Sequence, residues 1–192
     1  MTIDGWLILA FWLILIAVWA GSAGNAKRSI VGGWGWRREI ALRLAILAII
    51  LLVLRLTGVR HALSGARLYA LNRSAVAGIV GVMFCGLGAG LAIIARIHLG
   101  RNWGMPMSRK ENPELVTSGP YAYVRHPIYT GMLIAMLGST IGVTPFWSIP
   151  LVLFGLYFVY SARKEEKLMM EQFPEQYAAY MRRTKMLMPF IL

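Results

Sequence analysis

Two polar clusters flank the last apolar stretch of the chain, and both contain side chains that can bind or react. The first runs from Tyr121 to Gly131, and the second is Arg163-Lys164-Glu165-Glu166. Ionisable side chains near lipid are costly unless they pair or face a cavity, which makes them candidates for a functional site. The glutamates can hold an amino group or ribose hydroxyls. Arg125, His126 and Arg163 can hold a carboxylate, and an arginine can do so bidentately.

The first cluster also has residues suited to a flat, cationic ligand. Tyr121, Tyr123 and Tyr129 can pack against a base or a sulfonium group, because aromatic faces attract cations. Pro127 suits the first position of a helix, where an N–H would be unpaired in any case. Gly131 lets a ligand approach the backbone closely. A zwitterionic amino acid joined to a nucleoside fits this set of residues, and S-adenosylmethionine is such a molecule.

The apolar stretch between the clusters must bring them together. Residues 126–162 are too long for one ordinary span at about 1.5 Å per residue. Pro145 and Pro150 interrupt the stretch near its middle, where proline removes backbone donors and disfavours a straight helix. We predict a tight helical hairpin with its turn around residues 144–148. Both ends of the hairpin then emerge on one side of the membrane, and the two clusters become neighbours.

The rest of the chain is also typical of a membrane protein. Hydrophobic residues make up 58% of the 192 residues, above the soluble norm of about 45–50%. Residues 5–26, 40–56 and 74–95 form three further apolar runs long enough to span lipid. The segment after residue 163 begins as an amphipathic helix, in which Leu168, Phe173, Tyr177 and Tyr180 return at three- to five-residue steps.

The sequence therefore predicts an all-α integral membrane protein with about five transmembrane helices. We expect one domain over residues 1–192. Residues 1–97 would provide three N-terminal spans, and residues 98–192 would form the cofactor-binding core with the hairpin and the C-terminal helix.

The net charge of +12 favours contact with anionic lipid headgroups. Lys and Arg lie mostly between or beside the apolar runs, and no basic stripe with interleaved aromatics predicts a nucleic-acid partner. The positive-inside rule places the first loop, the site and the C-terminus in the cytoplasm and the N-terminus outside. That loop carries Lys27, Arg28, Arg37 and Arg38. The predicted outer loop is also basic, and its charges, which argue against this orientation, are those of Arg60, Arg67 and Arg73.

The ordered motifs of the second half resemble the isoprenylcysteine carboxyl methyltransferase family. The resemblance covers residues 99–192, about half of the chain. It rests on the following pieces: Leu99-Gly100-Arg101-Asn102-Trp103, Glu114-Leu115-Val116-Thr117-Ser118-Gly119-Pro120-Tyr121, Arg125-His126-Pro127-Ile128-Tyr129-Thr130-Gly131, Glu165-Glu166, Phe173-Pro174-Glu175-Gln176-Tyr177, Tyr180 and Pro189-Phe190-Ile191.

This resemblance implies a cofactor pocket at the cytosolic face that is covered by the C-terminal segment and opens sideways to lipid. By motif match, the residues that bind S-adenosylmethionine would be Leu115, Val116, Tyr121, His126, Pro127, Tyr129 and Glu166, with help from Glu165 and Gly131. Arg163 is the best match for the substrate-orienting arginine ahead of the acidic pair, and Arg163 and Glu166 are the expected catalytic residues. Because of its chemistry, Arg125 is also expected to bind the cofactor. Asn102 and Trp103 are expected to contact a lipophilic or lipidated substrate at the entrance to the site.

The expected reaction is in-line transfer of a methyl group to a carboxylate. A carboxylate is already ionised at neutral pH, since its ordinary pKa is about 4, and it needs no general base. The protein must desolvate it and aim it, and positioning can supply about 7–11 kcal/mol. Within the same class, a phospholipid amine or a thiol is an alternative acceptor. A nicotinamide-dependent membrane reductase of the sterol-reductase kind, which usually needs more spans, and a non-enzymatic scaffold are alternatives of other classes.

Each candidate also has a structural alternative. His126 could cap a helix end at the interface, and Glu165 and Glu166 could be a solvated helix start paired with neighbouring lysines. The glycines of residues 86–90 are interpreted as close helix packing rather than as a cofactor loop. No metal site is expected, because such a site needs several converging ligands. The sequence does not predict the oligomeric state.

Overall fold

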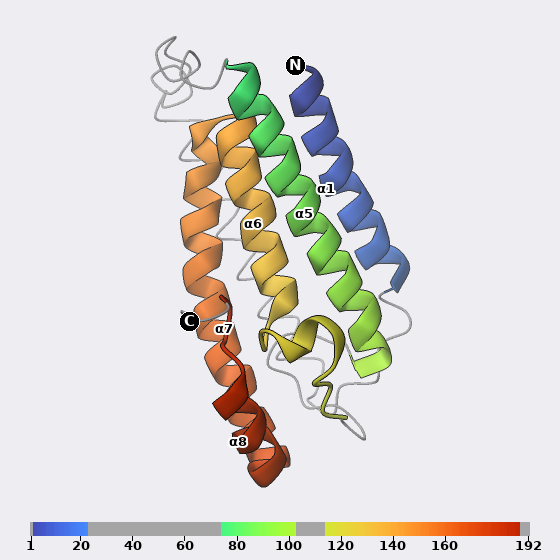
Figure 1. The fold of residues 1–192 in the computed structure, drawn as a ribbon, viewed down its shortest axis with the longest axis vertical. Coiled ribbons are helices and arrows are strands. Elements are labelled where there is room, and N and C mark those ends of the chain that lie inside the picture. Colours follow the sequence, from blue (N-terminus) through green and yellow to red (C-terminus); the bar gives the residue numbers. More distant parts are fainter. Residues whose placement is uncertain (1, 23–73, 103–113, 189–192) are drawn as a thin grey trace, which may run out of the picture.

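The computed structural model describes residues 2–22, 74–102 and 114–188, and within them it is almost entirely helical (Figure 1). The elements in chain order are α1 (Ile3–Ser22), α5 (Ala75–Leu99), η2 (Gly100–Asn102), η3 (Gly119–Ala122), α6 (Pro127–Gly142), η4 (Pro145–Trp147), α7 (Ser148–Gln172) and α8 (Pro174–Arg183). The predicted all-α membrane fold is confirmed. The predicted span at residues 40–56 and the loops on either side of it lie outside the described residues.

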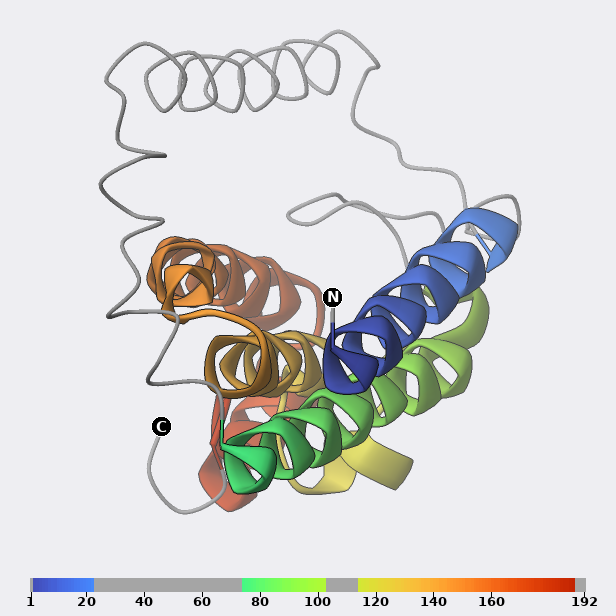
Figure 2. The same cartoon turned by 90° about the horizontal axis from the view of Figure 1, so that it is seen from above.

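Three of the helical segments are long and apolar enough to cross a membrane. They cover Ile3–Ser22, Ala75–Asn102 and Pro145–Gln172, and α6 is a shorter apolar helix beside them. In Figure 1 the helices lie side by side in the order α1, α5, α6 and α7, and the view from above in Figure 2 shows α1 against both α5 and α6. The described part of the chain is therefore a multi-helix membrane bundle with α6 at its centre.

Helices α6 and α7 form the predicted hairpin, and its turn lies at Pro145, as predicted. α6 ends at Gly142 and α7 begins at Ser148. Between them, the Thr144 side chain accepts a hydrogen bond from the Phe146 N–H at 3.4 Å, and Pro145 occupies the first position of η4. A side-chain acceptor at this place satisfies a backbone donor that the turn would otherwise leave unpaired.

Helices α5 and α6 pack backbone to backbone through small residues. A Cβ atom added to Gly88 would lie 2.3 Å from the Ala135 nitrogen, and one added to Gly138 would lie 2.4 Å from the Cys85 nitrogen. Close packing of this kind drives the association of helices in lipid, because the hydrophobic effect does not push two helices together there. The interpretation of the glycine-rich run as packing holds for Gly88 and for Gly86, whose added Cβ would lie 3.0 Å from the Phe11 ring of α1. Among the described residues, no atom lies within 4 Å of a Cβ added to Gly90.

Two side chains fasten α1 to this pair. The Trp12 indole N–H donates to the Ser139 hydroxyl at 3.0 Å, and the Trp12 ring stacks on Trp147 at 5.4 Å. At the other end, the buried Arg96 donates to the carbonyls of Ser22 at 2.8 Å and Gly100 at 3.0 Å. A cation there complements the negative ends of α1 and α5, so that the first helix is held along its length.

The polar segment after residue 162 folds differently from the prediction. An amphipathic helix was expected to begin there, but α7 continues unbroken through the charged cluster to Gln172. The break comes at Phe173, just before Pro174, which starts the short helix α8. Charged residues do not stop a helix, whereas a proline cannot continue one. The amphipathic C-terminal helix is therefore α8, and its buried face is formed by Tyr177 and Tyr180.

Candidate active site

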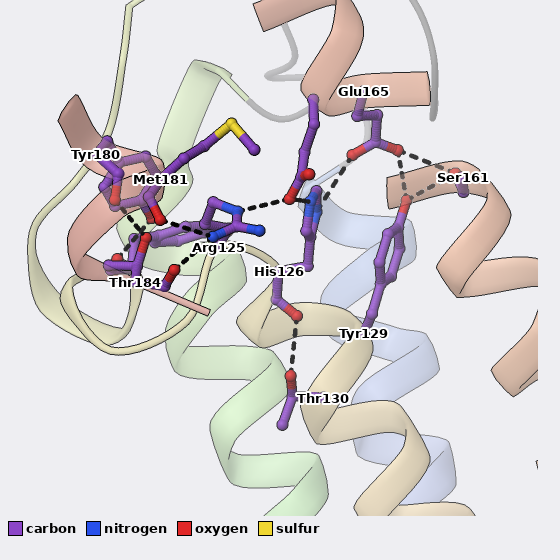
Figure 3. A network of polar contacts seen from close by, with 11 residues as sticks. Arg125, His126, Tyr129, Thr130, Ser161, Glu165, Tyr180, Met181 and Thr184 are labelled. Atoms are coloured by element: carbon purple, nitrogen blue, oxygen red, sulfur yellow. Dashed lines mark hydrogen bonds and ion pairs between the residues drawn. The ribbon is translucent and has the colours of Figure 1, made fainter. Parts of the chain in front are cut away.

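The two polar clusters meet at the foot of the hairpin, as predicted (Figure 3). Arg125 Nε donates to Glu166 Oε1 at 2.6 Å, and the two side chains are each 9% exposed. His126 stands between the carboxylates, with Nε2 3.4 Å from Glu166 Oε1 and Nδ1 3.6 Å from Glu165 Oε2. Because α6 begins at Pro127 and both glutamates lie on α7, closure of the hairpin itself brings these charges together.

Glu165 is oriented by two hydroxyl groups. Tyr129 donates to Glu165 Oε1 at 2.6 Å, and Ser161 donates to the same oxygen at 3.0 Å. The two hydroxyls are also 3.1 Å apart. Ser161 was not among the predicted site residues, although its place one helical turn before Glu165 could have indicated it. One carboxylate oxygen is thus held from two sides, and the other faces His126 at a distance longer than an ordinary hydrogen bond.

An aromatic stack continues from the charged residues into the apolar part of the hairpin. The His126 and Tyr129 rings are 5.5 Å apart and nearly parallel at 8°. Tyr129 and Phe158 follow at 4.5 Å and 5°. Phe158 was also missed, because an aromatic residue within an apolar span carries no signal of its own. The stack offers ring faces and edges beside the carboxylates, which suits a flat or cationic ligand.

Arg125 connects the carboxylates to the end of α8. Its Nη1 donates to the carbonyl of Thr184 and, at 3.5 Å, to that of Met181. Carbonyls near a helix C-terminus have no partner within the helix and carry partial negative charge, and so they favour a cation. One guanidinium therefore binds both Glu166 and the end of α8. The sequence analysis proposed a carboxylate-binding role for Arg125 but did not predict this second contact.

The tail that follows α8 runs back along the start of α6. The backbone N–H groups of Arg125 and His126 donate to the carbonyls of Lys185 at 2.8 Å and Met186 at 3.1 Å. The hydroxyl of Thr130 donates to the Leu187 carbonyl at 2.6 Å. These bonds satisfy donors that the start of a helix leaves unpaired. The tail thereby covers the foot of the hairpin on this side.

Tyr180 and Tyr121 join α8 to the loop before α6. The Tyr180 hydroxyl donates to the Tyr121 carbonyl at 2.6 Å. Burial raises the pKa of Tyr180 to about 12, so the phenol keeps the proton that it donates. The Tyr121 hydroxyl donates to the Ala95 carbonyl of α5 at 3.4 Å. The hydroxyl of Tyr121, a residue predicted to bind the cofactor, is therefore hydrogen-bonded to helix α5.

Several other predicted residues lie apart from the hydrogen-bonded cluster. Arg163 is exposed on α7, and Arg125 is the arginine that contacts Glu166. Asn102 donates to Glu114 at 3.1 Å. Leu115 and Val116 are half-buried in the segment before η3, and Trp103 lies outside the described residues. Within the described residues, the hydrogen-bonded cluster around the two glutamates is therefore made by residues at the foot of the hairpin.

Gly131 has a different neighbour from the predicted one. A Cβ atom on Gly131 would lie 2.6 Å from the Ala92 nitrogen and 2.6 Å from the Gly88 carbonyl oxygen. The side of Gly131 that we expected to admit a ligand is thus filled by α5. Pro127 does occupy the first position of α6, as predicted, and it is fully buried.

Comparison with known proteins adds a family to this geometry. A protein-family model described as "Phospholipid methyltransferase" matches residues 76–176, more than half of the chain. A cobalt-zinc-cadmium resistance protein, CzcN, of Cupriavidus metallidurans is 35% identical over 106 residues, which are 52% of this chain and 47% of that protein. Protein-S-isoprenylcysteine O-methyltransferase of Schizosaccharomyces pombe is 33% identical over 112 residues, 56% of this chain and 48% of that protein. The chain thus spans about half the length of these curated relatives.

A solved structure supports the same relationship. The structure of a eukaryotic intramembrane Ras methyltransferase, isoprenylcysteine carboxyl methyltransferase, matches with a TM-score of 0.53 and 28% sequence identity. The match covers 58% of this chain and 42% of that one. The resemblance drawn from the motifs is therefore confirmed by a curated relative and by a solved structure.

Proposed function

Because this chain belongs to the phospholipid methyltransferase family, we propose that it is an integral membrane methyltransferase that uses S-adenosylmethionine. We propose as its acceptor the carboxylate of a prenylcysteine-like or other lipophilic substrate. One observation carries the proposal: the hairpin brings Arg125, His126 and Tyr129 onto the two adjacent glutamates, within the residues that the family model matches. The proposed orientation has the site facing the cytoplasm and the N-terminus outside.

The donor set fits S-adenosylmethionine. Glu165 keeps one oxygen that neither Tyr129 nor Ser161 occupies, and this oxygen can accept a hydrogen bond from an amino group or a ribose hydroxyl. The stacked rings of His126 and Tyr129 lie beside it and can pack against a base or a cation. When bound, S-adenosylmethionine supplies an electrophilic methyl group on a sulfonium sulfur.

The residues of this chain then have binding and orienting tasks. Glu165 and Glu166 hold the cationic amino group and the hydroxyls, and Arg125 holds Glu166 in place through the 2.6 Å bond. Arg163, at the exposed edge of the cluster, is proposed to bind and orient the substrate carboxylate. That carboxylate needs no proton removed, because the ordinary pKa of such a group is about 4. Positioning is therefore the main contribution of the protein, and it is worth about 7–11 kcal/mol.

The remaining assignments rest on the motif match and on residue chemistry. Leu115, Val116, Tyr121 and Pro127 are proposed to complete the cofactor site, and Gly131 is proposed to let α6 pack closely against α5 behind it. Asn102 and Trp103 are proposed to line the entrance for the lipophilic substrate.

A second acceptor class is favoured by the description of the matching family model, which names phospholipids. The amine of a phospholipid headgroup must lose a proton before it can attack.

Two of the relatives are named for metal resistance, the second being the nickel-cobalt-cadmium resistance protein NccN of Alcaligenes xylosoxydans xylosoxydans, 32% identical over 107 residues. Among the described residues no group of three or more His, Cys, Asp or Glu side chains is placed to hold a metal, and we propose no metal-handling activity.

Ligand titration tests the cofactor assignment. The purified chain in detergent is titrated with S-adenosylhomocysteine and, separately, with NADPH. We expect saturable binding of the first ligand, weakened about tenfold to a hundredfold in Glu165→Gln, because hydrogen bonds to a charged group contribute about 1.5–3 kcal/mol. Glu175→Gln is the matched control, since this exposed glutamate of α8 loses the same charge outside the cluster. Binding of NADPH alone, or of neither ligand, would overturn the proposal.

Methyl transfer identifies the acceptor. The chain is incubated with methyl-labelled S-adenosylmethionine and either a farnesylated cysteine or phosphatidylethanolamine. A carboxyl methyl ester releases its label in mild alkali, whereas an N-methyl group does not. Alkali-labile label on the farnesylated cysteine supports the proposed acceptor, and stable label on the phospholipid would replace it with the amine.

A further inference from the structure

A basic hollow lies on the side of Arg125 that faces away from Glu165. It has a volume of about 630 Å³. Its walls are the loop before α6 and the end of α8, and the lining residues are Ala122, Tyr123, Arg125, Met181, Arg182, Arg183, Thr184 and Lys185. Four of these residues are cationic and none is acidic. Since Glu166 neutralises Arg125, the hollow carries about three uncompensated positive charges from exposed side chains.

The hollow lies at the level where a membrane helix meets the headgroups. Arg125 is two residues before the first residue of α6, an apolar helix of the membrane bundle. Tyr123 lines the hollow and is 74% exposed, and Met188 on the nearby tail is 50% exposed. Exposed apolar side chains beside cations are typical of surfaces that bind the lipid interface, where the apolar groups insert and the cations meet phosphate.

We propose that this hollow binds the phosphate headgroup of an anionic phospholipid, separately from the methyl-transfer site. Charge decides the occupant: three cations attract a phosphodiester, while Glu165 and Glu166 on the far side of Arg125 repel it from the catalytic cluster. Lipid bound there holds the end of α8 and the tail against the loop before α6. The proposal concerns a structural lipid and does not depend on which molecule is methylated.

Native mass spectrometry of the full chain measures this binding directly. The protein is released from bilayers of phosphatidylcholine alone or mixed with phosphatidylglycerol, and retained lipids are counted. We expect one retained phosphatidylglycerol per chain. Its affinity should fall about a hundredfold in Arg182→Gln/Arg183→Gln/Lys185→Gln, because each cation near an anionic surface contributes about fivefold. Should the triple variant fail to fold, Lys185→Glu alone should weaken binding at least fivefold.

The matched control is Arg101→Gln/Lys164→Gln/Lys167→Gln, which removes the same charge from exposed positions outside the hollow. This control should keep the lipid, and the thermal unfolding of both triple variants should be compared with that of the unaltered chain. Equal loss of lipid in both triple variants would show diffuse attraction instead of a site. The proposal would also be overturned if the chain retained phosphatidylcholine as well as it retains phosphatidylglycerol. Displacement of phosphatidylglycerol by inorganic phosphate at the concentration of the lipid would overturn it too.

Discussion

The contact between α5 and α6 predicts opposite effects for two alanine substitutions only two residues apart. In Gly88→Ala, the new Cβ would lie 2.3 Å from the Ala135 nitrogen and 2.5 Å from the Gly131 carbonyl oxygen. Ordinary contact begins at 3.4 Å, so the two helices must separate by about 1 Å. Both neighbours are backbone atoms, which cannot rotate away. Overpacking of this kind costs about 1–3 kcal/mol.

Gly90→Ala is the matched control on the same helix. No atom of the described residues lies within 4 Å of its added Cβ, and alanine favours a helix over glycine by up to about 1 kcal/mol. We therefore expect the free energy of unfolding to fall in Gly88→Ala and to stay unchanged or rise in Gly90→Ala. Both variants can be measured by unfolding the detergent-solubilised chain with increasing dodecyl sulfate. Equal stability of the two variants would refute the backbone contact between α5 and α6.

Three further substitutions test the foot of the hairpin. Ser161→Ala removes the 3.0 Å bond to Glu165 and should weaken S-adenosylhomocysteine binding about fivefold in a titration, since a typical hydrogen bond contributes about 1 kcal/mol. In the unaltered chain, the pKa of Tyr180 is raised from 10.0 to about 12, so its contribution to stability is complete below pH 10 and is lost as the pH rises through 12. In Tyr180→Phe, alkaline unfolding curves should lack this part of the decline. Thr130→Val removes the 2.6 Å bond to the tail, and trypsin should then cleave at Lys185 several times faster. A cleavage rate equal to that of the unaltered chain would contradict the role given to this bond.

The hairpin could be predicted because its signals are local. Proline disrupts a helix at its own position, and the apolar residues on either side of Pro145 favour two helices joined by a turn. The meeting of Arg125 with Glu166 then follows from closure of this hairpin. Local sequence was misleading where charge was taken for a helix end, since α7 continues to the residue before Phe173.

The rest of the site depends on contacts between distant residues. Arg163 is nearer to the glutamates in sequence, but the contact belongs to Arg125, which the tail and α8 hold in place. The neighbour of Gly131 depends on the rotation of α6 against α5, and local sequence patterns do not reveal this rotation. Only in hindsight does the spacing of Gly81, Cys85, Gly88 and Ala92 indicate one packed stripe.

The path of the tail has a consequence for how the protein is made. Residues 185–187 supply the acceptors for the Arg125 and His126 amides and for the Thr130 hydroxyl. Because these residues come after α6 and α7 in the chain, they are synthesised later than the hairpin that they complete. Until they are made, the amides of Arg125 and His126 lack these acceptors, and the foot of the hairpin is complete only after the tail has packed against it.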